Sequence, residues 1–95
     1  MSLQFEWDKN KAASNLTKHS VSFDEACSVF SDPLALIFDD EKHSSPDEFR
    51  EIIIGNSAKG RLLLVSYTER SQDVVRIISS RVATKHEQRD YEENS

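Results

Sequence analysis

Three apolar stretches in the second half of the chain constrain the fold more than any other feature of the sequence. Residues 49–55, 61–69 and 74–80 are rich in isoleucine, leucine and valine, and short polar segments separate them. The first separator, residues 56–60, has the length and the glycine of a hairpin loop, and the second, residues 70–73, is a polar turn. This arrangement predicts three consecutive strands that form a meander.

The first half of the chain predicts one strand followed by two helices. Leu3, Phe5 and Trp7 alternate with polar residues, a pattern typical of a short strand with one buried face. Asp8 can cap a helix over residues 9–19, because its short carboxylate can accept bonds from free amides in the first turn. We therefore expect the first helix to begin immediately after the first strand.

Two capping boxes mark the starts of two further helices. In the first, the Ser22 hydroxyl is expected to accept a bond from the Glu25 amide, and the Glu25 carboxylate to accept one from the Ser22 amide. The same spacing recurs from Thr84 to Glu87 and predicts a terminal helix that ends near residue 93.

The complete pattern predicts an α+β fold. Residues 34–38 have the composition of a strand, and residues 39–47 that of an exposed acidic loop, so the element order is β-α-α-β-β-β-β-α. We expect one domain over residues 1–95, with the helices packed on a mostly antiparallel sheet. Residues 62–65 and 77–78 are apolar at consecutive positions, which predicts central strands covered by helices on both faces.

Composition excludes several classes of protein. The content of 37% hydrophobic and 31% charged residues is typical of a soluble globular domain. The longest apolar run is too short to cross a bilayer, and the N-terminal residues do not have the pattern of a secretory signal. Cys27 is the single cysteine, which favours a reducing cytoplasm and a buried structural thiol. No cysteine and histidine cluster has the spacing of a zinc site.

The charge is unevenly distributed along the chain. The net charge is -5, which disfavours non-specific binding to nucleic acid. Residues 61–89, however, carry six basic and three acidic groups, whereas residues 21–60 carry three basic and nine acidic groups. The last strands can therefore hold a local phosphate site within an acidic protein.

Motifs over nearly the whole chain resemble those of one known family, the BrnT toxins. They are Phe5-Glu6-Trp7-Asp8, Lys11, Ala12, Asn15, Leu16, Lys18-His19, Val21-Ser22-Phe23-Asp24-Glu25-Ala26, Val29-Phe30-Ser31-Asp32-Pro33, Ile54-Gly55, Tyr67-Thr68-Glu69-Arg70, Arg76-Ile77-Ile78-Ser79-Ser80-Arg81, Ala83, Thr84, Glu87, Arg89 and Tyr91. Two positions depart from the family pattern: Ser20 and Ser80 stand where glycine and alanine are common.

The resemblance implies a bacterial type II toxin with the fold of the RelE-like ribonucleases. It also implies a ribbon-helix-helix antitoxin partner, called BrnA in this family, which binds the operator DNA in the toxin–antitoxin complex. We expect RNA as the substrate, no cofactor, no metal and no membrane contact. Serine at position 20 is expected to tighten a turn that glycine would ease, and Ser80 adds a hydroxyl beside the presumed site.

Arg76 and Arg81 are the first candidates for the chemistry of RNA cleavage. A guanidinium group makes bidentate contact with phosphate and stays charged, so it can stabilise the extra charge of a pentacoordinate phosphate. On a regular strand the two side chains point to opposite faces, so they meet one phosphate only if a bulge or the strand end re-aims Arg81. The alternative is surface ion pairing, for example with Glu69 or Asp73.

His19 and Glu69 are the candidates for proton transfer. Histidine exchanges a proton near neutral pH with little tuning, although His19 can instead bond the last carbonyls of its helix. Glu69 can act as a base, or can orient Arg70 or Arg76. Lys18 stays a third possible base, although that role requires a large fall of its pKa on burial.

The sequence therefore predicts a metal-independent endoribonuclease that uses the RNA 2′-hydroxyl as nucleophile and inhibits translation. The catalytic hypothesis names His19, Glu69, Arg76 and Arg81, and the RNA-binding hypothesis names Lys18, Tyr67, Arg70 and Ser79. Tyr67 either stacks on a base or is a half-buried residue of the sheet. The alternative function is a non-catalytic module that docks an antitoxin and modulates operator binding.

Overall fold

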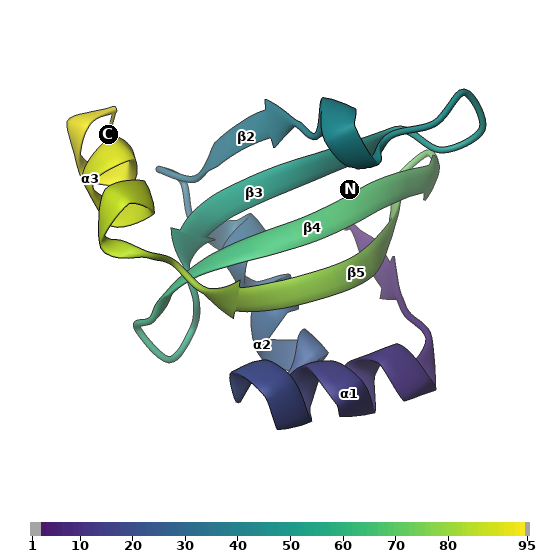
Figure 1. Ribbon diagram of the computed structural model, residues 1–95, viewed down its shortest axis with the longest axis horizontal. Helices are drawn as coiled ribbons and strands as arrows, with labels where there is room; N and C mark the ends of the chain where they lie inside the picture. Colours follow the sequence, from purple (N-terminus) through teal and green to yellow (C-terminus); the bar gives the residue numbers. More distant parts are fainter. Residues whose placement is uncertain (1–2, 95) are drawn as a thin grey trace.

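The protein is built on one five-stranded sheet with the strand order β1-β5-β4-β3-β2 (Figure 1). The computed structural model describes residues 3–94. The strands are β1 (Gln4–Glu6), β2 (Leu36–Asp39), β3 (Arg50–Asn56), β4 (Leu62–Ser71) and β5 (Val74–Val82). All neighbouring strands are antiparallel except β1 and β5, which run parallel. The predicted α+β class and the mostly antiparallel sheet are confirmed.

Within residues 3–94, three α-helices and two short 3₁₀ helices complete the fold. They are α1 (Lys9–His19), α2 (Phe23–Ser28), α3 (Lys85–Glu93), η1 (Val29–Ser31) and η2 (Glu41–His43). Figure 1 shows α1 along the β5 edge of the sheet, α2 behind the sheet and α3 at one end of it. Among the residues described, no helix is long and apolar enough to cross a membrane.

The predicted strand 34–38 begins two residues late, at Leu36. The Asp32 carboxylate accepts a bond from the Leu34 amide at 2.9 Å, and the Asp32 carbonyl accepts one from the Ala35 amide at 3.1 Å. These two bonds hold the chain in a turn after Asp32, so pairing with β3 starts only when the turn is complete.

The two predicted capping boxes have different outcomes. The box from Thr84 to Glu87 is complete, with bonds of 3.2 Å to the Thr84 hydroxyl and 2.9 Å to the Glu87 carboxylate. At α2 only the Ser22 hydroxyl makes its bond, at 3.0 Å from the Glu25 amide. The prediction of a reciprocal bond is wrong because the Glu25 carboxylate instead accepts bonds from Arg61 and from the buried Ser57 hydroxyl.

The hydrophobic core lies on one face of the sheet only. Buried residues of α2 and its flanks pack against Leu63 and Val65 of β4 and Ile77 of β5. The prediction that helices cover both faces of these strands is wrong. Leu64 and Ile78 are half-buried on the other face, since α3 contacts β3 only at one end of the sheet. This face is called the open face below, and the opposite one the helix-covered face.

Candidate functional site

The register of β5 against β4 places both candidate arginines on the open face. Thr68 pairs with Arg76, whereas Ser66 pairs with Ser79 and Leu64 with Arg81. Between these pairs Tyr67 is opposite Ile77, so β5 contains one extra residue, Ile78, at this point.

This extra residue is the bulge that the arginine hypothesis requires. Regular alternation over the five steps from Arg76 to Arg81 would place their side chains on opposite faces. One inserted residue shifts the alternation by one step, so Arg81 returns to the face of Arg76. Ile78 and Ser79, on either side of the shift, both line the open face.

Arg76 is held by a carboxylate from the first strand. Its guanidinium Nη1 lies 2.9 Å from Oε2 of Glu6, the residue that pairs with Arg76 in the parallel β1–β5 ladder. Arg70 approaches the same oxygen, with its Nε at 3.9 Å. The ion pair considered from the sequence therefore exists, but with Glu6 in place of Glu69 or Asp73.

Arg81 is held by a carboxylate from the last helix. Its Nη1 and Nη2 lie 2.8 Å from Oε1 and Oε2 of Glu87, which is the planar two-bond geometry of a strong ion pair. The bond from Arg81 is the main cause that lowers the pKa of Glu87 to about 2. The capping box of α3 fixes Glu87, and Glu87 in turn fixes the direction of Arg81.

Two hollows meet on the open face at Ile78 and Ser79. One extends over the sheet to Arg50 and Arg81, and the other extends to α1, where Lys18 and His19 line it. The end of α1 and the bulged part of β5 therefore border a common surface. The basic residues that line the two hollows are Lys11, Lys18, His19, His43, Arg50 and Arg81.

Asn15 holds α1 in this position. Its side-chain amide donates bonds to the carbonyls of Ser80 at 2.8 Å and Val21 at 3.0 Å, and its oxygen accepts one from the Ser80 amide at 3.0 Å. Asn15 is only 6% exposed. It binds the edge of β5 as a neighbouring strand would, beyond the three residues that pair with β1.

Comparison with known proteins gives the family. The model of the family described as "Ribonuclease toxin, BrnT, of type II toxin-antitoxin system" matches residues 7–87. This chain belongs to the BrnT family. Its fold is similar to that of the Brucella abortus ribonuclease toxin BrnT, with a TM-score of 0.66 and 22% identity over 88% of this chain and 100% of that chain. A search of curated proteins gives no match.

Two of the residues predicted for the BrnT site lie on the helix-covered face. Tyr67 is buried, and its ring packs edge-on against Phe30 at 5.0 Å between ring centres. Glu69 pairs with Val75, a core residue, and so faces the same side. Lys18, His19, Ser79 and Arg81 line the two adjoining hollows. Arg76 lies on the same face of the sheet but lines neither hollow, and Arg70 approaches its partner Glu6. Tyr67 and Glu69 lie on the opposite face.

Sequence reasoning missed three residues of the open face. Arg50 pairs with Thr68 in the same cross-strand row as Arg76, so it faces the same surface. His43 lines one hollow, with its Nδ1 3.0 Å from Asp40. Glu6 belongs to the family motif, and its bond to Arg76 depends on the pairing of β1 with β5. The alternation of residues 49–55 is the one signal that could have found Arg50, once the register of the sheet is known.

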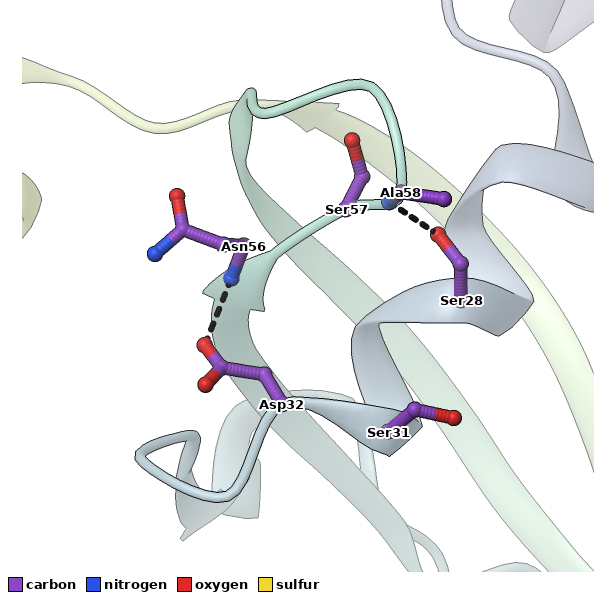
Figure 2. Close-up of a pocket in the computed structure, with 6 residues that line it drawn as sticks. All are labelled: Ser28, Ser31, Asp32, Asn56, Ser57 and Ala58. Carbon is purple, nitrogen blue, oxygen red and sulfur yellow. Dashed lines mark hydrogen bonds between the residues drawn. The ribbon is translucent and has the colours of Figure 1, made fainter.

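Two further features of this BrnT chain, Cys27 and a polar hollow, lie apart from the predicted site residues. Burial raises the pKa of the Cys27 thiol to about 11, so the sulfur stays protonated and a poor nucleophile. Figure 2 shows a polar hollow where η1 meets the β3–β4 turn. There the Asn56 amide donates to Asp32 and the Ala58 amide to Ser28, each at 2.8 Å. No predicted site residue lines this hollow.

Proposed function

We propose that this chain is a metal-independent endoribonuclease that cuts single-stranded RNA on the open face and thereby inhibits translation. The main support is the bulge at Ile78, because it puts Arg76 and Arg81 on one face of the sheet. The end of α1 borders the same face. A scissile phosphate over Ser79 would lie beside Arg81, with Lys18 and His19 across the adjoining hollow and Arg76 farther along the same face of β5. The family description as a ribonuclease toxin supports this assignment.

Cleavage at this surface needs no group from outside the chain and the RNA. The 2′-hydroxyl of the RNA loses its proton and its oxygen attacks the adjacent phosphorus. The bond from phosphorus to the 5′-oxygen breaks, and that oxygen gains a proton, which leaves a 2′,3′-cyclic phosphate and a 5′-hydroxyl. Arg76 and Arg81 stabilise the additional negative charge on the phosphorane oxygens.

His19 and a carboxylate share the proton transfers in this proposal. An imidazole can accept the 2′-hydroxyl proton or donate to the leaving oxygen. Glu6 takes the place assigned to Glu69, because Glu6 lies on the open face and contacts Arg76, whereas Glu69 faces the core. Glu6→Gln should slow cleavage about 100-fold. Glu69→Gln is the matched control and should leave the rate within about threefold of wild type.

The other cations of the open face bind the RNA strand. Lys18 and Arg70 are exposed and reach phosphates on either side of the scissile one, and the Ser79 hydroxyl lies where the two hollows meet. Arg50 extends this surface across the sheet. A strand of RNA can thus contact a local group of cations although the whole chain has a charge of -5.

The direct test is cleavage of a defined single-stranded RNA by the purified chain, freed of any partner, in excess EDTA. The expected product carries a 2′,3′-cyclic phosphate. Arg76→Ala/Arg81→Ala should lower the cleavage rate about 1,000-fold without unfolding the protein, as circular dichroism can verify. Lys85→Ala/Arg89→Ala removes two exposed cations of α3 and is the matched control. An equally active arginine double variant would refute the assignment.

A second candidate function is a non-catalytic module that docks the antitoxin. It is favoured by the ion pairs of Arg76 with Glu6 and of Arg81 with Glu87, because each guanidinium already has a carboxylate partner. Induction of the chain alone should arrest bacterial growth if it is a nuclease and should be harmless if it only docks. Under both functions we propose a BrnA-like ribbon-helix-helix antitoxin as the partner that neutralises the chain and contacts operator DNA.

A further inference from the structure

One end of the helix-covered face leaves large apolar side chains in contact with solvent. Leu3, Ile37 and Phe49 are 41%, 56% and 53% exposed. Between them the half-buried rings of Phe5 and Phe30 pack at 5.1 Å between centres and line a hollow. Burial of such side chains by a partner is favourable, so a cluster of them on a small domain marks an interaction surface.

The register of the sheet makes this cluster continuous. Arg50, the first residue of β3, pairs with Thr68, so continuing the alternation by one residue puts Phe49 opposite Glu69 on the helix-covered face. Glu69 pairs with Val75, which pairs with Phe5 across the next strand. One row of side chains therefore runs from Phe49 through Glu69 and Val75 to Phe5, across β4, β5 and β1.

Carboxylates surround the apolar row. Asp39 pairs with Glu51, and Glu51 pairs with Tyr67, so all three face the side on which Glu69 lies. Burial, followed by the repulsion of Asp39 and Glu69, raises the pKa of Glu51. We call the set of Leu3, Phe5, Phe30, Ile37 and Phe49 with Asp39, Glu51 and Glu69 the acidic apolar patch.

We propose that the acidic apolar patch docks the antitoxin through a segment that combines apolar side chains with lysine or arginine. The inference rests on the proposed neutralisation of this toxin by an antitoxin. Nucleic acid does not fit here, because its phosphates would meet three carboxylates that no basic side chain of the sheet offsets on this face of the described residues. A basic, apolar protein segment matches both the charge and the hydrophobicity.

The position of the patch separates docking from cleavage. The alternating side chains of β3, β4 and β5 point either to the patch side or to the open face, so the two surfaces share strands but no side chains. Substitutions can therefore remove antitoxin binding while RNA cleavage is kept, and the reverse. If the partner bound mainly to the open face, substitutions there would abolish antitoxin binding and RNA cleavage together.

The experiment measures binding by calorimetry, with the protein encoded by the reading frame beside this chain's own gene as the probe. Ile37→Ser/Phe49→Ser and Asp39→Lys change exposed residues and should each weaken binding at least about 10-fold. Leu34→Ser and Glu92→Lys change equally exposed residues outside the patch and are the matched controls. The RNA cleavage rate of all four variants should equal that of wild type.

The outcomes separate this inference from the proposed nuclease function. Loss of binding by the patch variants, with Arg76→Ala/Arg81→Ala still bound, supports the patch even if the wild type cuts no RNA. Wild-type affinity in the patch variants overturns it, as does a wild-type chain that does not bind the probe. Self-association of the wild type in sedimentation, abolished by Ile37→Ser/Phe49→Ser, also overturns it in favour of a second copy of the chain.

Discussion

The two faces of the sheet are made from the same strands but serve different purposes. On the helix-covered face, β4 and β5 present Val65 and Ile77, which are almost inaccessible to solvent and form the core. On the open face the intervening positions include Arg76, Ser79 and Arg81, and the two arginines are held by carboxylates from β1 and α3. The alternation breaks at Ile78, and this break puts Arg81 on the same face as Arg76.

The sharpest test of this difference uses two adjacent residues of β5. Ile77→Ala should lower the free energy of unfolding by about 3 kcal/mol, because it leaves a cavity in the core. Arg76→Ala should lower the cleavage rate by about 100-fold, equal to about 2.7 kcal/mol of transition-state stabilisation, with stability nearly unchanged. Urea unfolding and cleavage kinetics on both variants measure the contrast. Equal effects of the two substitutions on stability would remove the distinction between the faces.

Asn15 binds both Val21 of the core and the edge of β5, so its substitution should lower both the stability and the cleavage rate. Asn15→Ala removes three hydrogen bonds and leaves the carbonyls of Val21 and Ser80 and the Ser80 amide unpaired. We expect a loss of about 2 kcal/mol of stability. Because α1 would also lose its anchor on β5, His19 should be misplaced and cleavage slowed even at temperatures at which the variant is folded. Thermal melting and single-turnover kinetics measure the two effects separately.

The elements were predictable from the sequence because local patterns decide them. The Asp8 cap and the period of apolar residues place α1 at Lys9–His19, as expected, and the Thr84 box places α3. Contacts between residues far apart in the sequence were not predictable. The position of β1 beside β5 decides that Arg76 pairs with Glu6, and no pattern within residues 3–7 contains that information.

The site was predictable only in part, for the same reason. The family motifs make the arginines and His19 candidates, but alternation alone could not say which face each residue of β4 and β5 would occupy. One extra residue at Ile78 reverses the faces beyond it, and only the strand pairing reveals where that residue lies. Glu69 and Tyr67 were therefore grouped with Arg76 although they face the core side.

The ion pair of Arg81 with Glu87 predicts how stability on the open face depends on pH. The pKa of Glu87 is about 2, below the ordinary 4.5, so its contribution is complete above about pH 4.5 and is lost as the pH falls towards 2. Glu87→Gln keeps the capping box but removes the charge. We expect a loss of about 1 kcal/mol at neutral pH that disappears near pH 2 in denaturant titrations. A constant difference at all pH values would exclude the ion pair as its cause.

A substitution at Ser20 should raise the stability of the protein, whereas the substitutions of Asn15 and Glu87 above lower it. It ends α1 in the left-handed region, with φ 57, where a side chain costs energy and glycine does not. Ser20→Gly should therefore raise stability by about 1 kcal/mol, whereas Ser20→Ala, which keeps the Cβ, should not. The strain expected from the sequence at this position is present in the structure. A destabilised Ser20→Gly in thermal melting would mean that the hydroxyl, not the backbone, matters here.

The smallest effect is expected at Ser80, on the helix-covered side of the bulge. Its Oγ is the one buried side-chain polar atom without a hydrogen-bond partner among residues 3–94, although its backbone groups are bound by Asn15. Ser80→Ala removes an unpaired hydroxyl from an apolar environment and should stabilise the protein by about 0.5 kcal/mol. The cleavage rate should not change, because the side chain faces away from Arg81. A slower Ser80→Ala variant of unchanged stability would show that the bulge does not isolate the two faces, and that chemistry on one depends on packing on the other.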